Sequence, residues 1–196
     1  MDRSIKVLIL CDIFGKKYLP ELLIKELCSK YDVKILDAYL EEYAFENERE
    51  AYDIFISSCG HERYYELVKS YCLVNQVDMI IGFSIGASVA WRICAENLKI
   101  KKAICFYPSQ IRKHLELTPS FSCDIIFAKK EDSFNTVEVK KVLDKKDFIS
   151  VSISEYNHGF MNPKSQNYSN EALKKYMNYI DNCSLNIVNE IKESVK

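Results

Sequence analysis

Short apolar runs alternate with longer amphipathic stretches along the chain. The first run, IKVLILC (5–11), is continuously apolar, which is typical of a strand buried on both faces of a sheet. It is followed by PELLIKELCSKY, where Pro20 suits the first turn of a helix and Leu23 and Leu27 share one side of it. Strands that alternate with helices predict a parallel sheet with right-handed crossovers and helices on both faces.

The same two patterns continue along the rest of the chain. Apolar runs predict further strands over residues 32–37, 52–57, 77–83, 101–108, 123–128 and 148–154, with the weakest pattern at 52–57. Amphipathic stretches predict helices over residues 62–74, 84–98 and 135–146, and a long helix from about residue 169. We therefore expect an α/β fold with a mostly parallel sheet of about six strands, in a single domain over residues 1–196. Such sheets bind their ligands beyond the carboxyl ends of the strands.

Composition and charge exclude several classes of protein. The chain has 196 residues, of which 48% are hydrophobic and 28% charged, an ordinary globular composition. A net charge of −1 and scattered basic residues argue against a nucleic-acid partner. No stretch approaches the roughly 20 apolar residues of a membrane span, and the N-terminal apolar run is too short for a signal peptide. We expect a cytoplasmic protein without membrane association.

The eight cysteines favour free thiols over disulfides or a metal site. No two of them form a C-x-x-C pair, so the usual spacing of a zinc site is missing. Cys11, Cys105 and Cys123 lie in or beside predicted strands, as buried free thiols of a reducing compartment do. We expect neither a metal nor an organic cofactor.

One stretch carries a chemical signal. In IIGFSIGASVAW (80–91) a predicted strand leads through GFSIG into a predicted helix, with Ser84 between two glycines. A serine on so tight a turn takes a strained backbone, and side chains two positions away would collide with neighbouring elements. This arrangement is the nucleophile elbow of α/β-hydrolases. It predicts Ser84 as a nucleophile; a helix N-cap serine between packing glycines is the alternative explanation.

A serine nucleophile needs a base, and the base needs an orienting acid. In this fold the three follow the chain order serine, acid, histidine. Of the three histidines, His61 precedes the serine and His114 precedes the candidate acids. Only His158, in the polar loop SEYNHGFMNP after the last predicted strand, keeps the order and reaches the same sheet edge.

The acid is expected in KKEDSFN, directly after the predicted strand 123–128. Glu131 and Asp132 are both available there. Asp132 fits the D-x-F pattern usual after this strand, whereas counting three residues from Ala128 gives Glu131. We prefer Asp132 slightly and keep Glu131 as the alternative.

An oxyanion hole needs two backbone N–H groups aimed at the carbonyl oxygen of the substrate. One is expected from Ile85, the residue after the serine. The other is expected from the loop CDIFG (11–15), which leaves the first strand.

Together these stretches resemble the dienelactone hydrolase family of the α/β-hydrolase superfamily over most of the chain. IIGFSIGA resembles the family's G-F-C-x-G-G elbow, and NHGF resembles its histidine loop. VLILCDIFG resembles its first core strand and E-I-F-G loop, and AICFYP its next strand with a tyrosine at the end. The resemblance implies that Ile13 donates the second oxyanion N–H and that Asp12 and Tyr107 belong to the substrate site.

Two positions depart from the family pattern. Ser84 replaces the family's nucleophilic cysteine, and Asp12 replaces a glutamate in the oxyanion loop. Both changes disfavour the dienelactone substrate and leave ester-type hydrolysis intact. Because the chain starts at the strand before the oxyanion loop, we expect no antiparallel edge strands and no sizeable lid. The site should be open and shallow, suited to small or surface-presented acyl groups.

A further candidate lies in SQIRKH (109–114), after another strand at the same edge. Arg112 has the guanidinium fork that suits a substrate carboxylate or phosphate, and His114 could assist it. A surface ion pair for Arg112 is an equal alternative.

The sequence thus predicts a serine hydrolase that cleaves a small carboxylic ester, lactone or thioester through an acyl-enzyme. Two alternatives stay open: a cysteine enzyme that uses Cys59 in SSCGHE, and a non-catalytic binding module on the hydrolase scaffold. The expected partner is a small-molecule acyl substrate. The protein is expected to be a monomer, or a homodimer through an exposed edge strand.

Overall fold

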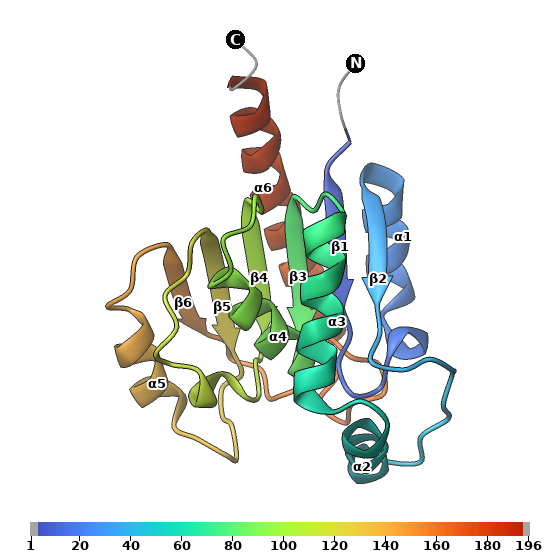
Figure 1. Cartoon of the computed structure of the whole chain (residues 1–196). Helices are drawn as coiled ribbons and strands as arrows, with labels where there is room; N and C mark the ends of the chain where they lie inside the picture. Colours follow the sequence, from blue (N-terminus) through green and yellow to red (C-terminus); the bar gives the residue numbers. More distant parts are fainter. Residues whose placement is uncertain (1–3, 194–196) are drawn as a thin grey trace.

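The structure, a computed structural model, describes residues 4–193 and is built around one sheet of six strands (Figure 1). The strands are β1 (Lys6–Leu10), β2 (Asp32–Leu36), β3 (Met79–Phe83), β4 (Lys102–Phe106), β5 (Ser122–Phe127) and β6 (Ile149–Ile153). They lie in the order β2-β1-β3-β4-β5-β6, and all five neighbouring pairs are parallel. The predicted α/β fold with a parallel sheet is confirmed.

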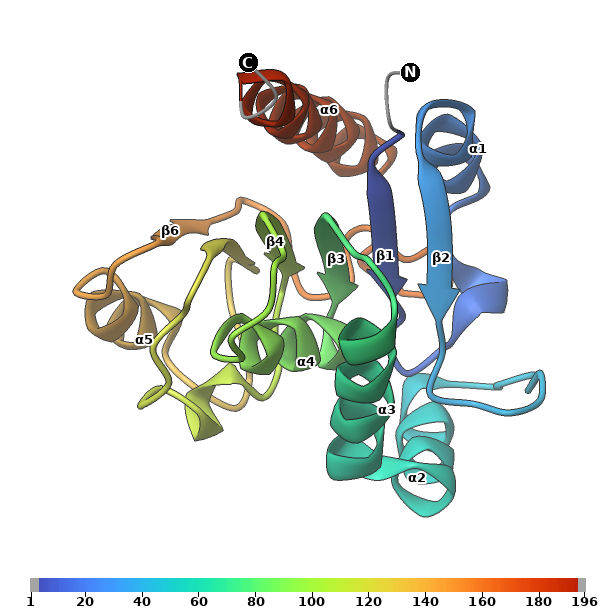
Figure 2. The ribbon, with the colours of Figure 1, turned by 45° about the horizontal axis from the view of Figure 1, so that its top comes forward.

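Helices cover both faces of the sheet. They are α1 (Glu21–Lys30), α2 (Glu48–Ser58), α3 (Gly60–Val74), α4 (Ile85–Cys94), α5 (Thr136–Leu143) and α6 (Asn170–Glu193). Figure 2 shows α1 and α6 on one side of the sheet and α3, α4 and α5 on the other, with α2 beside α3.

Alternate side chains of β1 supply two separate cores. Leu8 and Leu10 pack with residues of α3 and α4, whereas Val7 and Ile9 pack with residues of α1 and α6. Successive side chains of a strand point to opposite faces, so a strand covered on both sides is apolar throughout. The edge strands β2 and β6 are only partly buried, and their sequences are correspondingly mixed.

The expected strand over residues 52–57 is wrong, because this segment lies inside helix α2. The Asn47 side chain caps the helix by accepting from the Glu50 backbone N–H at 3.0 Å, and Glu50 in turn accepts from the Glu46 N–H at 2.6 Å. This N-x-x-E pattern is a helix start signal. Ala51 and Phe55, four residues apart, turn one face of the helix into the core.

The direction of chain winding changes between β1 and β3. From β1 the chain crosses by α1 to β2, and it then returns over the other face by α2 and α3 to β3, on the opposite side of β1. A crevice opens at such a switch point beyond the carboxyl ends of the two strands. The residues after β1 and after β3 therefore meet at the place where this fold binds its ligands.

Parts of two expectations lie outside the described residues. These are residues 1–3 and 194–196 of the expected single domain, and any continuation of α6 beyond residue 193. In the part of the chain that the structure describes, no helix combines the length and apolarity needed to cross a membrane.

Candidate active site

Ser84 stands on the tight turn between β3 and α4. Its backbone is strained, with φ 50° and ψ −110°. Gly82 and Gly86 make the turn possible, because a Cβ on Gly82 would lie 2.6 Å from the Gly86 carbonyl oxygen and one on Gly86 would lie 2.5 Å from that of Cys11. The glycine spacing seen in the sequence is thus required by backbone packing on both sides of the serine.

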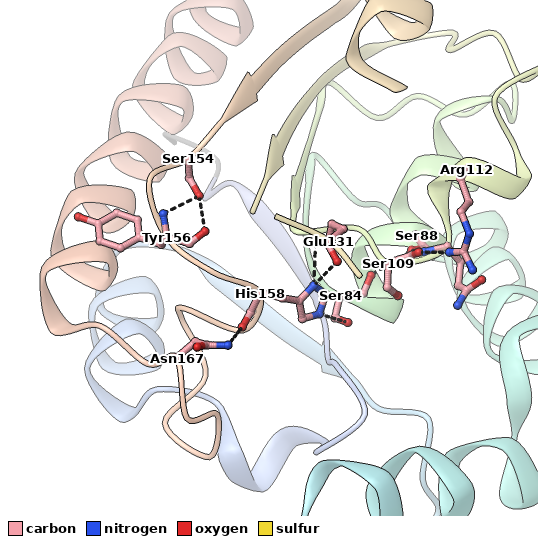
Figure 3. Close-up of polar contacts among 10 residues, drawn as sticks. Ser84, Ser88, Ser109, Arg112, Glu131, Ser154, Tyr156, His158 and Asn167 are labelled. Carbon is pink, nitrogen blue, oxygen red and sulfur yellow. Dashed lines mark hydrogen bonds and ion pairs between the residues drawn. The ribbon is translucent and has the colours of Figure 1, made fainter. Parts of the chain in front are cut away.

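Three side chains from three different loops meet at this turn (Figure 3). The Ser84 hydroxyl oxygen lies 3.0 Å from Nε2 of His158. The carboxylate oxygens of Glu131 lie 2.8 and 2.9 Å from Nδ1 of the same imidazole. An ionised carboxylate can only accept a hydrogen bond, so Nδ1 carries the hydrogen and Nε2 is free to accept from the serine hydroxyl.

The structure places Glu131, and not the preferred Asp132, beside His158 as the acid. The Glu131 side chain is 6% exposed and lies against His158. The Asp132 side chain is 99% exposed and is 3.9 Å from the Lys130 ammonium. The backbone N–H of Lys129 donates to the carbonyl of Tyr156 at 2.7 Å, which fixes the acid loop beside the histidine loop.

The imidazole is partly enclosed and surrounded by negative charge. Burial lowers the pKa of His158, but the hydrogen bond and charge of Glu131, with the charges of Glu48 and Asp12, outweigh that effect and raise the pKa above its ordinary value of 6.5. The carboxylates therefore favour uptake of a proton by the neutral imidazole.

The sequence predicts that the backbone N–H groups of Ile85 and Ile13 form the oxyanion hole. Ile85 is the first residue of α4, so its N–H has no acceptor within the helix. Ile13 lies in the loop after β1, and the Tyr39 hydroxyl donates to its carbonyl at 2.5 Å. That bond fixes the orientation of the loop peptide, while the next N–H, of Phe14, donates to the Asp12 carboxylate at 2.9 Å.

Asp12 is buried beneath the site and does not line an open surface. Asn162 of the histidine loop donates to its second carboxylate oxygen at 2.5 Å. Burial raises the pKa of Asp12 to about 6, against the lowering effect of its bonds to Asn162 and Phe14. The sequence did not single out Asn162, since an asparagine before a proline reads as turn chemistry. The pair joins the oxyanion loop to the histidine loop.

Tyr107 is also buried rather than open to a substrate. It is 1% exposed, has φ 41°, and follows β4 directly. Its ring packs edge-on against the imidazole of His158, with 5.0 Å between centroids, and against Phe160 at 4.8 Å. Its contact with His158 supports the imidazole from below.

The remaining candidates lie on the other side of the serine. The Arg112 guanidinium donates to the Ser109 carbonyl at 2.5 Å and lies 5.9 Å from the ring centroid of Phe134. His61, His114 and Cys59 line a pocket next to Ile85. Burial raises the pKa of the Cys59 thiol more than nearby Arg63 lowers it, which disfavours a thiolate nucleophile there.

Two pockets, each of about 440 Å³, adjoin the site. One lies between the start of α3 and α4 and includes Ile85; the other includes His158 and Glu131. Within residues 4–193, no group of three or more His, Cys, Asp or Glu side chains is arranged to hold a metal ion.

Comparison with known proteins identifies the family of the chain. The family model described as "Dienelactone hydrolase family" matches residues 5–182. The chain belongs to the dienelactone hydrolase family. No curated protein matches this family member in sequence.

Solved structures give the same fold at low sequence identity. The Klebsiella pneumoniae subsp. pneumoniae MGH 78578 protein named "putative dienelactone hydrolase" has a TM-score of 0.67 and 17% identity, with 90% of this chain and 85% of that chain covered. Mouse alpha/beta hydrolase domain-containing protein 10 has a TM-score of 0.68 and 9% identity, covering 95% and 92%. The dienelactone hydrolase-like promiscuous phosphotriesterase P91 from metagenomic libraries has a TM-score of 0.62 and 11% identity, covering 97% of this chain and 87% of that chain. This dienelactone hydrolase family member is thus a hydrolase of the α/β type.

Proposed function

We propose that the protein is a serine hydrolase that cleaves a carboxylic ester, lactone or thioester through an acyl-enzyme. One observation carries the proposal: the Ser84 oxygen lies 3.0 Å from Nε2 of His158, whose Nδ1 faces the Glu131 carboxylate at 2.8 Å. Within hydrogen-bonding reach, an oriented imidazole can take the serine proton. Family membership over residues 5–182 supports the same chemistry.

In the first half-reaction, Ser84 Oγ attacks the substrate carbonyl carbon while Nε2 of His158 accepts the hydroxyl proton. Glu131 stabilises the imidazolium that forms. The negative charge on the former carbonyl oxygen is stabilised by the N–H groups of Ile85 and Ile13 and by the N-terminus of α4. His158 then returns the proton to the leaving oxygen or sulfur, the bond to the acyl carbon breaks, and the acyl-enzyme remains.

In the second half-reaction, His158 takes a proton from water, and the resulting hydroxide-like oxygen attacks the acyl carbon. The bond between that carbon and Ser84 Oγ breaks, and the proton returns to the serine. The products are the carboxylic acid and the free enzyme. In each proton transfer of this scheme, His158 is the group that accepts or donates the proton.

The test is hydrolysis of p-nitrophenyl acetate by the wild type and by Ser84→Ala. We expect turnover by the wild type and none above background in the variant, with an unchanged circular dichroism spectrum. Turnover that survives in a folded Ser84→Ala protein would contradict the proposal. A folded wild type that hydrolyses no activated ester would favour a non-catalytic binding module on the same scaffold.

A further inference from the structure

The two pockets that adjoin the site, one lined by Ile85 and the other by His158, differ in chemical character. In Figure 3, His158 and Ser88 lie on opposite sides of Ser84. The pocket on the Ser88 side, here called the apolar pocket, presents mainly carbon atoms from residues that include Ile85 and Val89. The pocket on the His158 side, here called the polar cleft, is lined by Glu48, Ser109, Lys130, Glu131, Asp132, Ser133, Asn157, His158 and Asn167.

The apolar pocket is close to neutral. Its Arg92 is held by Glu62 in a two-pronged ion pair of 2.9 and 2.8 Å. Burial lowers the pKa of both His61 and His114, which favours their uncharged form. Lys113 is the remaining charged residue that lines this pocket, and it is exposed.

The polar cleft carries an excess of negative charge. Asp132 forms an ion pair with Lys130 at 3.9 Å, and Glu131 is hydrogen-bonded to His158. Glu48, the first residue of α2, enters no ion pair or side-chain hydrogen bond found among residues 4–193, and its charge acts on His158 across the cleft. Of the three carboxylates that line the cleft, Glu48 is thus the one available to bind a ligand.

The chemistry of acyl transfer decides which half of the substrate enters each pocket. His158 Nε2 takes the Ser84 proton and must deliver it to the leaving oxygen, so the leaving group has to lie on the histidine side. The carbonyl oxygen turns toward the N–H groups of Ile85 and Ile13, and the acyl chain takes the remaining direction, away from the leaving group and from His158. The leaving group therefore faces the polar cleft, and the acyl group faces the apolar pocket.

We propose that the substrate is an ester of an apolar acyl group with a polar alcohol that bears no negative charge, and that Glu48 selects this alcohol. A cationic alcohol is favoured over a neutral one, and an anionic alcohol is disfavoured. The inference rests on the proposed function and names the substrate class of the same site.

Three butyrate esters of similar size test the selection: those of choline, of 3,3-dimethylbutanol and of 2-hydroxyethanesulfonate. The first alcohol is cationic, the second is its neutral isostere and the third is anionic. We expect the wild-type kcat/KM to fall in that order, by up to roughly fivefold at each step, the size of an exposed charge pair. The preference should shrink at 0.5 M NaCl, because salt screens exposed charges.

Glu48→Gln should bring the three kcat/KM values together. Glu48→Lys should reverse the order. Asp53→Asn is the matched control, since it removes an exposed carboxylate from the same helix, outside the residues that line the cleft. It should keep the wild-type order.

The outcomes separate this inference from the proposed function. Hydrolysis without any charge preference, or a preference that Glu48→Gln retains, overturns the assignment of Glu48 and leaves the serine hydrolase standing. An equal loss on all three esters in Glu48→Gln would mean a structural role and also overturns the assignment. If the wild type hydrolyses none of these esters nor p-nitrophenyl acetate, the proposed function and this inference fall together.

Discussion

Glu131 and Asp132 are adjacent in the chain but lie in opposite surroundings, and the difference can be measured. Glu131→Gln removes the charge that orients and stabilises the imidazolium, so we expect kcat/KM for p-nitrophenyl acetate to fall on the order of 10³- to 10⁴-fold. Asp132→Asn changes a side chain that is 99% exposed and is expected to alter kcat/KM by less than about twofold. The reverse pattern would show that Asp132, and not Glu131, supports the histidine.

The charge around His158 predicts the acid limb of the pH profile. The imidazole must be unprotonated to accept the serine proton, so activity is lost as the pH falls through its pKa. Because the balance of burial and carboxylates raises that pKa, we expect kcat/KM to decline with an apparent pKa above 6.5. In Glu131→Gln the charge of Glu131 no longer raises the pKa of His158, while burial still lowers it. The acid limb should therefore move to lower pH. A wild-type limb below 6.5, or one that stays in place in Glu131→Gln, would contradict this account.

At the scale of elements, the oxyanion loop and the histidine loop are joined through the buried Asp12–Asn162 pair. A carboxyl whose pKa rises from 3.8 to about 6 on folding binds its proton more tightly in the folded state. Ionised Asp12 therefore costs stability as the pH rises from about 4 to 7, by roughly 2 kcal/mol over that range.

Asp12→Asn removes this titration. We expect the difference in unfolding free energy, variant minus wild type, to become more positive by roughly 2 kcal/mol between pH 4 and pH 7. Urea denaturation of both proteins at several pH values measures it, and the titration of groups that Asp12 does not influence cancels in the difference. A difference that is flat with pH would contradict the buried, ionisable Asp12.

Most elements could be predicted from hydrophobic patterning, and the exception is instructive. Buried parallel strands such as β1 are apolar throughout, which makes them easy to recognise. The segment 52–57 carries apolar residues in a short run that fits a strand or a helix. Its helical signal lies outside that run, in the Asn47–Glu50 cap.

The candidate site was predictable where local geometry forces the residue type. Gly82 and Gly86 are needed by the turn around Ser84, and the sequence shows this directly. The choice between Glu131 and Asp132 depends on which way one loop turns against another. Spacing along the chain carries no information on that orientation.

At the scale of the whole molecule, the sheet order brings distant segments together. The switch point between β1 and β3 places the loop of Asp12 beside Ser84, and the ends of β5 and β6 bring in Glu131 and His158. Glu48 reaches the same cleft from α2, a helix that the sequence pattern did not predict. Residues that surround a site from separate elements show no common motif, so only the assembled fold reveals them.

The central claim is that Ser84 is an activated nucleophile, and a fluorophosphonate probe tests it most directly. Such a probe reacts with a serine whose proton can pass to a base, and the product is a covalent phosphonyl adduct. We predict one adduct per chain on the peptide that contains Ser84, and a strongly reduced yield in folded His158→Ala. A native protein that stays unlabelled, or that is labelled equally well without His158, would contradict the account.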